Sequence, residues 1–279
     1  MQSVISLDLT SNSISSEGGA ELINLLMYNY SLIDLNISSL EGLQRNTLGP
    51  AGVKPLRELL HVNHFLSILN LSGNFIGDMG ICYLGEGLKK HPVNTSLKSL
   101  NLQSNDITGD GAEKLYQCLK NTGVTHLNLS KNPLKIKGAK AVGDMIMKGN
   151  DINIDVLDIS ECQITHPGAV FIYNGIRRCQ SLDVLIMDRN KLTAKYISEL
   201  SQALWMNNTL IKLSMAHCEL YDDGGIYLFD GLERNMKLVE LNISHNNLRF
   251  LCAKRIAEVL TVKDMCVESL NLSHNSLTD

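Results

Sequence analysis

Three histidines recur at nearly equal spacing in this 279-residue sequence, at His217, His245 and His274. If the segments that carry them are neighbouring strands, their imidazoles lie in a row about 4.8 Å apart. Such a row has suitable donors for a zinc ion, and its rings would repel one another when protonated at about pH 6. Ser-His-Asn is also an ordinary turn sequence. These interpretations stay open at the level of sequence.

No other residues form a recognisable catalytic pattern. The sequence contains no G-x-x-x-x-G-K-S/T, no H-E-x-x-H and no G-x-S-x-G. The carboxylates of Asp8, Asp34, Asp158 and Asp188 belong to separate segments, so no paired-carboxylate site follows. We therefore predict a protein that is not an enzyme, with no catalytic residue, no cofactor and no bound metal.

Composition narrows the class of partner and the compartment. The 25 basic and 29 acidic residues give a net charge of −4, without the basic cluster that nucleic-acid binding requires. No apolar run is long enough to span a membrane, and the first residues do not resemble a signal peptide. Seven cysteines without a CxxC pair favour reduced thiols. Several of the eight Asn-x-Ser/Thr sequons fall inside expected strands, where glycans would cover the binding face, which favours the cytosol. We predict a cytoplasmic protein, no nucleic-acid partner and no membrane span.

One pattern recurs along the whole sequence, most clearly as Leu97-xx-Leu100-x-Leu102-xx-Asn105-x-Ile107. The alternating leucines predict a short strand with one buried face, and the Asn predicts a turn. Ten copies occur at intervals of 27 to 34 residues, and their central residues are Leu7, Leu35, Leu69, Leu100, Leu127, Leu157, Leu185, Leu213, Leu241 and Leu270.

A second pattern follows each strand. Gly111 and Ala112 begin a segment with Leu115 and Leu119 at helical spacing, which predicts a helix with one buried face. Such units bury their apolar faces only by stacking. We expect an α/β solenoid in a horseshoe, with parallel strands on the concave side and helices on the convex side. It forms one domain over residues 1–279, with an inserted loop near 39–45.

The Leu-xx-Leu-x-Leu-xx-Asn/Cys-x-Leu pattern, with its period of 28 or 29 residues, resembles the ribonuclease-inhibitor-like subclass of leucine-rich repeats. The resemblance implies a protein–protein interaction scaffold or adaptor that binds a protein ligand on its concave face, within a larger assembly such as a cytoskeletal or ciliary complex. The alternative is a regulator of a small GTPase, similar to Ran GTPase-activating protein, in which Arg45 of the inserted loop reaches the nucleotide. The tenth copy stops at Asp279 without its helix, which indicates a fragment or an end covered by another molecule.

The sixth to eighth copies replace the Asn and Ser that fill the expected concave face elsewhere. Apolar residues form a centre there and charged residues a rim, as in protein interfaces. Trp205, which follows the last buried leucine of its helix, is an additional candidate contact. The alternative is a surface whose apolar residues only pack on one another. The predicted partner-binding residues are Val156, Asp158, Val184, Ile186, Asp188, Arg189, Lys212, His217 and Trp205.

Overall fold

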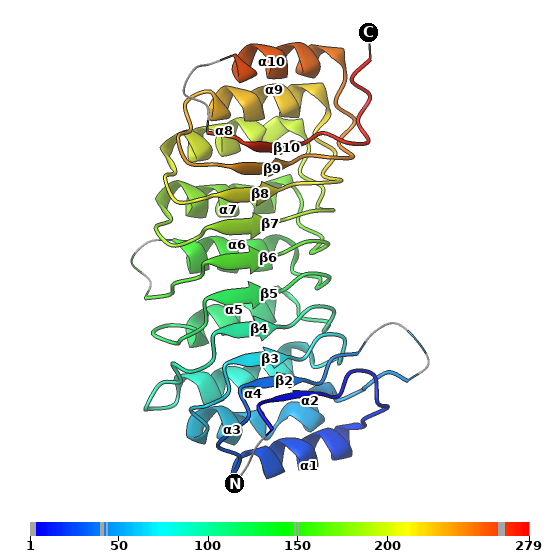
Figure 1. Ribbon diagram of the computed structural model, residues 1–279, viewed down its shortest axis with the longest axis vertical. Helices are drawn as coiled ribbons and strands as arrows, with labels where there is room; N and C mark the ends of the chain where they lie inside the picture. Colours follow the sequence, from blue (N-terminus) through cyan, green and yellow to red (C-terminus); the bar gives the residue numbers. More distant parts are fainter. Residues whose placement is uncertain are drawn as a thin grey trace. The chain divides into compact units, whose positions relative to one another are not determined.

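The protein consists of two compact units built from the same repeat of strand, turn and helix. The computed structural model describes residues 4–39, 42, 44–147, 149, 151–261 and 266–278. Unit 1 comprises Met1–Leu134 with Asp151–Ile154, and unit 2 comprises Lys135–Asn150 with Asp155–Asp279. In each unit the helices lie on one face of the parallel strands (Figure 1). A single domain over all 279 residues stays a prediction.

Unit 1 carries the first five strands. They pair in parallel and in sequence order, as the repeat predicts. Its elements are β1 (Ser6–Asp8), α1 (Ser16–Leu26), β2 (Asp34–Asn36), α2 (Gly49–Val53), α3 (Leu56–Val62), β3 (Ile68–Asn70), α4 (Gly77–Lys89), β4 (Ser99–Asn101), α5 (Gly109–Cys118) and β5 (His126–Asn128).

Unit 2 carries the other five strands, which also pair in parallel and in sequence order. Its elements are α6 (Lys135–Ile146), β6 (Val156–Asp158), α7 (His166–Arg178), β7 (Val184–Ile186), the 3-10 helix η1 (Ala194–Tyr196), α8 (Ile197–Met206), β8 (Lys212–Ser214), α9 (Tyr221–Leu232), β9 (Glu240–Asn242), α10 (Phe250–Leu260) and β10 (Ser269–Asn271).

The central leucine of each strand sets the register. Leu35, Leu69 and Leu100 are consecutive partners in unit 1, and Leu185 and Leu213 are partners in unit 2. All five are at most 1% exposed. Since side chains alternate along a strand, the residues on either side of each leucine point away from the helices. We call this side of the strands of each unit its strand face.

The predicted turn asparagines are confirmed, and their hydrogen bonds reach further than their own turn. The Asn105 Oδ1 accepts from the backbone N–H of Asn74, in the preceding repeat, at 2.9 Å. Its Nδ2 donates to the Leu71 carbonyl at 2.9 Å. Asn105 is fully buried, so these bonds satisfy backbone groups that water cannot reach. We call this repeated arrangement the asparagine ladder.

Cysteine replaces asparagine twice in unit 2, as the sequence predicts. The Cys218 Sγ lies 3.4 Å from the carbonyl oxygens of Met187 and Ala216. The Cys162 Sγ lies 3.5 Å from the Ser160 carbonyl. Burial raises the pKa of the Cys218 thiol to about 12, so it stays protonated. Cys118, Cys162, Cys218 and Cys252 are all buried.

The second repeat departs from the expected single helix. Its helical segment divides into the short helices α2 and α3, and Pro55 is the N-cap of the second. Proline lacks the N–H that a continuous helix requires, which accounts for the break. The expected inserted loop near 39–45 includes Leu40, Glu41 and Leu43, which lie outside the described residues, as does Asp279.

Candidate functional site

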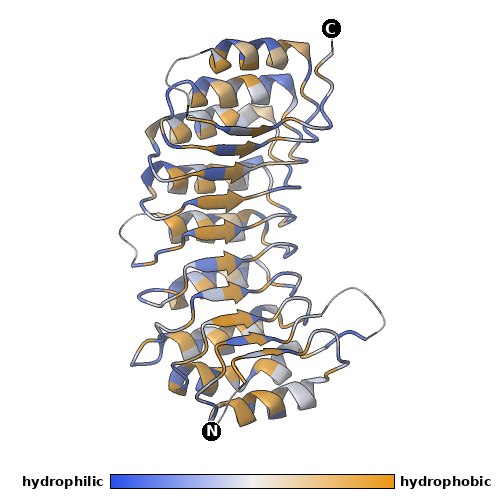
Figure 2. Ribbon diagram, viewed as in Figure 1, coloured by the Kyte–Doolittle hydropathy of each residue, from blue (hydrophilic) through white to orange (hydrophobic). Residues whose placement is uncertain are grey.

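The strand face of unit 2 brings most of the predicted partner-binding residues onto one surface. Val156 is the register partner of Val184, and Asp158 is the register partner of Ile186. Lys212 pairs with Val184 on the other side. These side chains are half-buried, whereas the leucines between them are buried. Figure 2 shows β7 as an apolar strand along its length.

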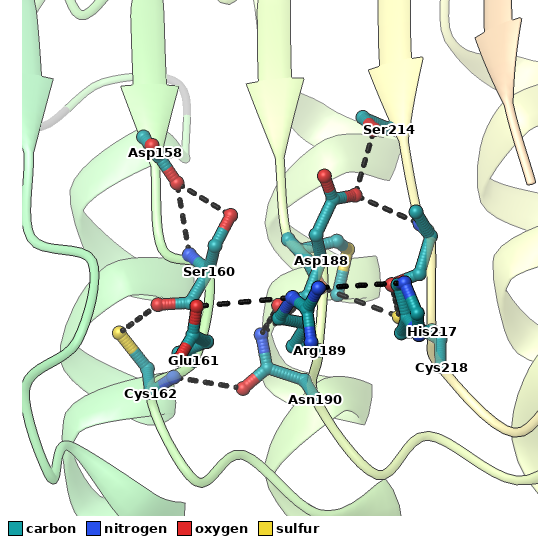
Figure 3. Close-up of polar contacts among 12 residues, drawn as sticks. Asp158, Ser160, Glu161, Cys162, Asp188, Arg189, Asn190, Ser214, His217 and Cys218 are labelled. Atoms are coloured by element: carbon teal, nitrogen blue, oxygen red, sulfur yellow. Dashed lines mark hydrogen bonds and ion pairs between the residues drawn. The ribbon is translucent and has the colours of Figure 1, made fainter. Parts of the chain in front are cut away.

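The two aspartates of this face hold the backbone rather than standing free. The Asp188 Oδ1 accepts from the Ser214 hydroxyl at 2.6 Å and from the Ala216 N–H at 2.8 Å (Figure 3). The Asp158 Oδ1 accepts from the N–H and the hydroxyl of Ser160, at 2.9 and 2.7 Å. One oxygen of each carboxylate is therefore occupied by these bonds. These two carboxylates therefore have fewer acceptor positions left for a partner than a charged rim would require.

The basic residues of the surface also have neighbours. The Lys212 Nζ lies 2.8 Å from the Glu240 carboxylate, and each side chain is almost half exposed. The Arg189 Nε lies 3.8 Å from the Glu161 carboxylate, and its Nη2 lies 3.5 Å from the His217 Nε2 (Figure 3). Exposed pairs of this kind contribute little to stability, so both cations can exchange partners at small cost.

A hollow on this face extends away from the predicted centre. It has a volume of about 330 Å³ and combines Ile186, Asp188 and Lys212 with residues of β9 and β10. The predicted residues Val156, Asp158, Val184, Arg189, His217 and Trp205 do not line it. The complete lining is Ile186, Asp188, Lys212, Leu213, Ser214, Glu240, Leu241, Asn242, Ser269 and Asn271.

Sequence reasoning missed Glu240, although a signal for it was present. Lys212 and Glu240 stand at the same position of consecutive repeats, 28 residues apart. Opposite charges at such a spacing predict a cross-strand ion pair in a parallel sheet. The neighbouring Asn242 and Asn271 belong to the Asn and Ser residues that occupy this face in most repeats. Both nevertheless line the hollow.

Trp205 lies on a different surface from the other predicted residues. It belongs to α8, is 54% exposed, and has the Arg234 Cζ 5.3 Å from its ring centre. It lines a second hollow, of about 250 Å³, together with residues at the end of α9 and with Arg255 in the middle of α10. A ligand that fills the strand-face hollow does not need to touch Trp205.

The three histidines form a stack. The ring centres of His217 and His245 are 3.9 Å apart, and those of His245 and His274 are 4.1 Å apart, with nearly parallel planes. We call these three residues the imidazole column. Partial desolvation, then His217, His274 and Arg189, lower the pKa of His245 below its usual value. Within the described residues, no three His, Cys, Asp or Glu side chains are arranged to hold a metal ion.

Arg45, the candidate arginine of the GTPase-regulator alternative, does not project as expected. Its side chain is half-buried, and its Cζ lies 5.1 Å from the centre of the Phe75 ring. This cation–π contact holds the guanidinium against the third repeat.

The described parts of the chain contain no helix of the length and apolarity that a membrane span requires.

The family model for the leucine-rich repeat matches more than half of the chain, over residues 1–22, 62–84, 93–115, 120–143, 207–229, 234–249 and 263–279. The chain belongs to the leucine-rich-repeat family. The matched model describes a structural repeat and not a catalytic family.

Curated relatives support the ribonuclease-inhibitor-like subclass. The chain is 28% identical over 211 residues to ribonuclease inhibitor of Mus musculus, covering 74% of this chain and 46% of that protein. It is 28% identical over 280 residues to NACHT, LRR and PYD domains-containing protein 14 of Mus musculus, covering 99% of this chain and 27% of that protein. The chain thus spans half or less of the length of these relatives.

Among solved structures, an internalin from Listeria monocytogenes aligns with 99% of this chain and 82% of its own, at 16% identity and a TM-score of 0.43.

Proposed function

We propose that this protein is a non-enzymatic scaffold or adaptor that binds a protein partner on the strand face of unit 2. The hollow between Ile186, Lys212 and Glu240 is the observation that carries the proposal. Desolvating apolar surface such as Ile186 contributes about 25 cal/mol per Å². The exposed Lys212–Glu240 pair can form directional, charge-assisted hydrogen bonds to a partner at little cost. Apolar and charged groups thus meet in one recess.

The proposal also includes a cytoplasmic location, a ligand that is not nucleic acid, and a place in a larger assembly. Cys118, Cys218 and Cys252 are buried thiols outside any disulfide, as expected of a cytoplasmic protein. The net charge of −4 gives no support for nucleic acid as the ligand. A place in a larger cytoskeletal or ciliary assembly agrees with a repeat that offers an extended surface.

The GTPase-regulator alternative receives less support. An arginine that completes the catalytic site of another protein must extend toward its nucleotide. Arg45 instead contacts Phe75 and is half-buried. We therefore favour the scaffold.

Photo-crosslinking with the intact chain tests the proposal. A benzoylphenylalanine placed at Ile186 should crosslink to one defined protein in cell extract. The same residue at Asn101, in the third position of β4 in unit 1, is the matched control, because Ile186 is the third residue of β7. The Ile186 product should disappear when Lys212 and Glu240 are both changed to alanine. Equal crosslinking from both positions, or a product indifferent to the double change, would refute a specific site at the hollow.

A further inference from the structure

The imidazole column and Arg189 occupy one position in four consecutive turns. Each residue directly precedes the Asn or Cys of the repeat, and each has a φ of 55°. Histidine and asparagine tolerate this left-handed conformation better than most side chains. The turn therefore accounts for the presence of a histidine at each place. It does not require three in succession beside an arginine.

Arg189 is the permanent cation of this row, and the row itself contains no carboxylate. It lies next to His217, and the rings follow at intervals of about 4 Å. Glu161 flanks Arg189 at the other end of the row. Among neighbouring charges, Asp188 is bonded to Ser214 and Ala216, and Glu219 lies 4.0 Å from Lys191. The charges that act on His245 are His217, His274 and Arg189, all of which oppose its protonation.

A metal ion fits this arrangement poorly. Ligands of a zinc ion must converge on one point, with each ring nitrogen directed toward the metal. In parallel stacked rings the nitrogen lone pairs lie in parallel planes and point side by side. Carboxylates do not need to converge on one point. Each protonated imidazole can donate an N–H from its ring edge to a separate carboxylate.

We propose that the imidazole column and Arg189 form a binding site for a carboxylate-rich segment of a protein partner, and that the imidazoles take up protons when it binds. A carboxylate at the ring edges offsets the repulsion between neighbouring imidazolium groups. By linkage, a ligand that favours the protonated column binds more tightly as the pH falls through the range in which histidine titrates. The pH response is a property of this complex.

An acidic peptide suits the row better than nucleic acid does. Nucleic acid is bound through many permanent cations, whereas Arg189 is the only arginine or lysine in this row of four turn residues. Extended peptides place alternate side chains on one side, so a run of glutamates can reach several ring edges at once. The site is also independent of the strand-face hollow, because neither Arg189 nor the column lines it. An experiment that refutes one of the two sites therefore leaves the other untouched.

Fluorescence anisotropy with labelled hexaglutamate and the full chain tests the site. At constant ionic strength we expect affinity about fivefold higher at about pH 6 than at about pH 7.5. Glutamate side chains stay ionised over this range, so the change reports on the protein. Hexaglutamine and oligothymidylate are the uncharged and nucleic-acid probes. Both should bind more weakly than hexaglutamate at about pH 6.

The decisive variant carries His217→Asn, His245→Asn and His274→Asn, because asparagine tolerates the left-handed turn and does not titrate. It should lose the pH dependence. The variant Arg189→Gln should weaken binding at both pH values. The variant His64→Asn removes an exposed histidine of unit 1 and is the matched control, with unchanged binding expected. Circular dichroism checks that each variant is folded.

Should the triple variant unfold, His274→Asn alone carries the test, because His274 is the exposed end of the column. It should reduce the pH response while melting normally. NMR adds a second readout, in which hexaglutamate raises the titration midpoint of His245 in the wild type. The proposal is overturned if hexaglutamate does not bind, if the folded histidine variants keep the full pH response, or if oligothymidylate binds as tightly.

Discussion

Units 1 and 2 contain the same strand and the same buried leucine but differ in several of the residues that face outward. On the strand face of unit 1 the third strand residue is Asn in β2 to β5. In unit 2 the same position holds Asp158, Ile186 and Ser214 before Asn returns in β9. Turn residues differ similarly, since cysteine replaces ladder asparagine only in unit 2 among the described repeats. The buried residues specify the repeat, whereas the outward residues vary between copies and can differ in what they bind.

The sharpest test of this difference is a pair of matched double variants. Replacing Ile186 and Lys212, which both line the strand-face hollow, by alanine should weaken a strand-face partner by about 2 to 4 kcal/mol, as expected of interface hot spots. The control pair Ser99→Ala and His126→Ala changes flanking positions of β4 and β5 in unit 1, and should have far less effect. Titration calorimetry with the isolated partner measures both. Similar losses from the two pairs would show that unit 2 holds no specialised surface.

A second test compares the two versions of the turn. Asn105→Ala removes bonds to the backbone of Asn74 and Leu71 and leaves buried groups unsatisfied, which should lower the free energy of unfolding by about 2 to 3 kcal/mol. Cys218→Ala removes only weak thiol contacts and should cost about 1 kcal/mol. Urea unfolding followed by circular dichroism gives both values. If the two variants lose the same stability, thiol and amide are equivalent in the turn.

Thiol labelling tests burial in both units. Cys118 of unit 1 and Cys252 of unit 2 are buried, and burial raises the pKa of Cys252 to about 12. Both should react more than about tenfold more slowly with iodoacetamide in the native protein than in urea. Cys82, which is only half-buried, should be labelled faster and is the internal reference. Mass spectrometry identifies the labelled sites, and rapid native labelling of Cys252 would contradict its buried position.

The smallest expected effect is the pH dependence of unit 2. The folded state lowers the pKa of His245, so it contributes stability above the pKa of the unfolded chain. That contribution is lost as the pH falls through the lower, folded value. The melting temperature of the wild type should therefore drop more between about pH 7 and about pH 5 than that of the His245→Asn variant. Identical slopes would show that the stacked rings do not influence folding.

The repeat itself was predictable from sequence because its signal is repeated ten times. The spacing of Leu35, Leu69 and Leu100 across copies gave the register of the strands directly. The histidine row followed from the same spacing, and its rings are stacked as expected of neighbouring strands. Hydrophobic periodicity carries such information well, because buried positions tolerate few side chains.

The details of the candidate site were less predictable, because side-chain partners depend on three-dimensional choices among polar groups. From sequence, Asp188 is only an acidic residue that follows an apolar strand. In the structure its carboxylate accepts hydrogen bonds from Ser214 and Ala216. Similarly, the loop position of Arg45 indicated a projecting side chain, whereas a phenylalanine 30 residues later attracts its guanidinium. Neither contact has a periodic signal. The hollow at Glu240 required the side chains of four strands together.

The asparagine ladder also makes neighbouring repeats of unit 1 open together. The amide hydrogen of Asn74 is held by a side chain 31 residues later, and that of Asn105 by the Asn132 side chain 27 residues later. Loosening one repeat removes a bond from the repeat before it, so local opening spreads along the stack. In deuterium exchange these amides should share one slow rate. The turns at Cys162 and Cys218, with weaker side-chain contacts, mark where such a cooperative unit can end.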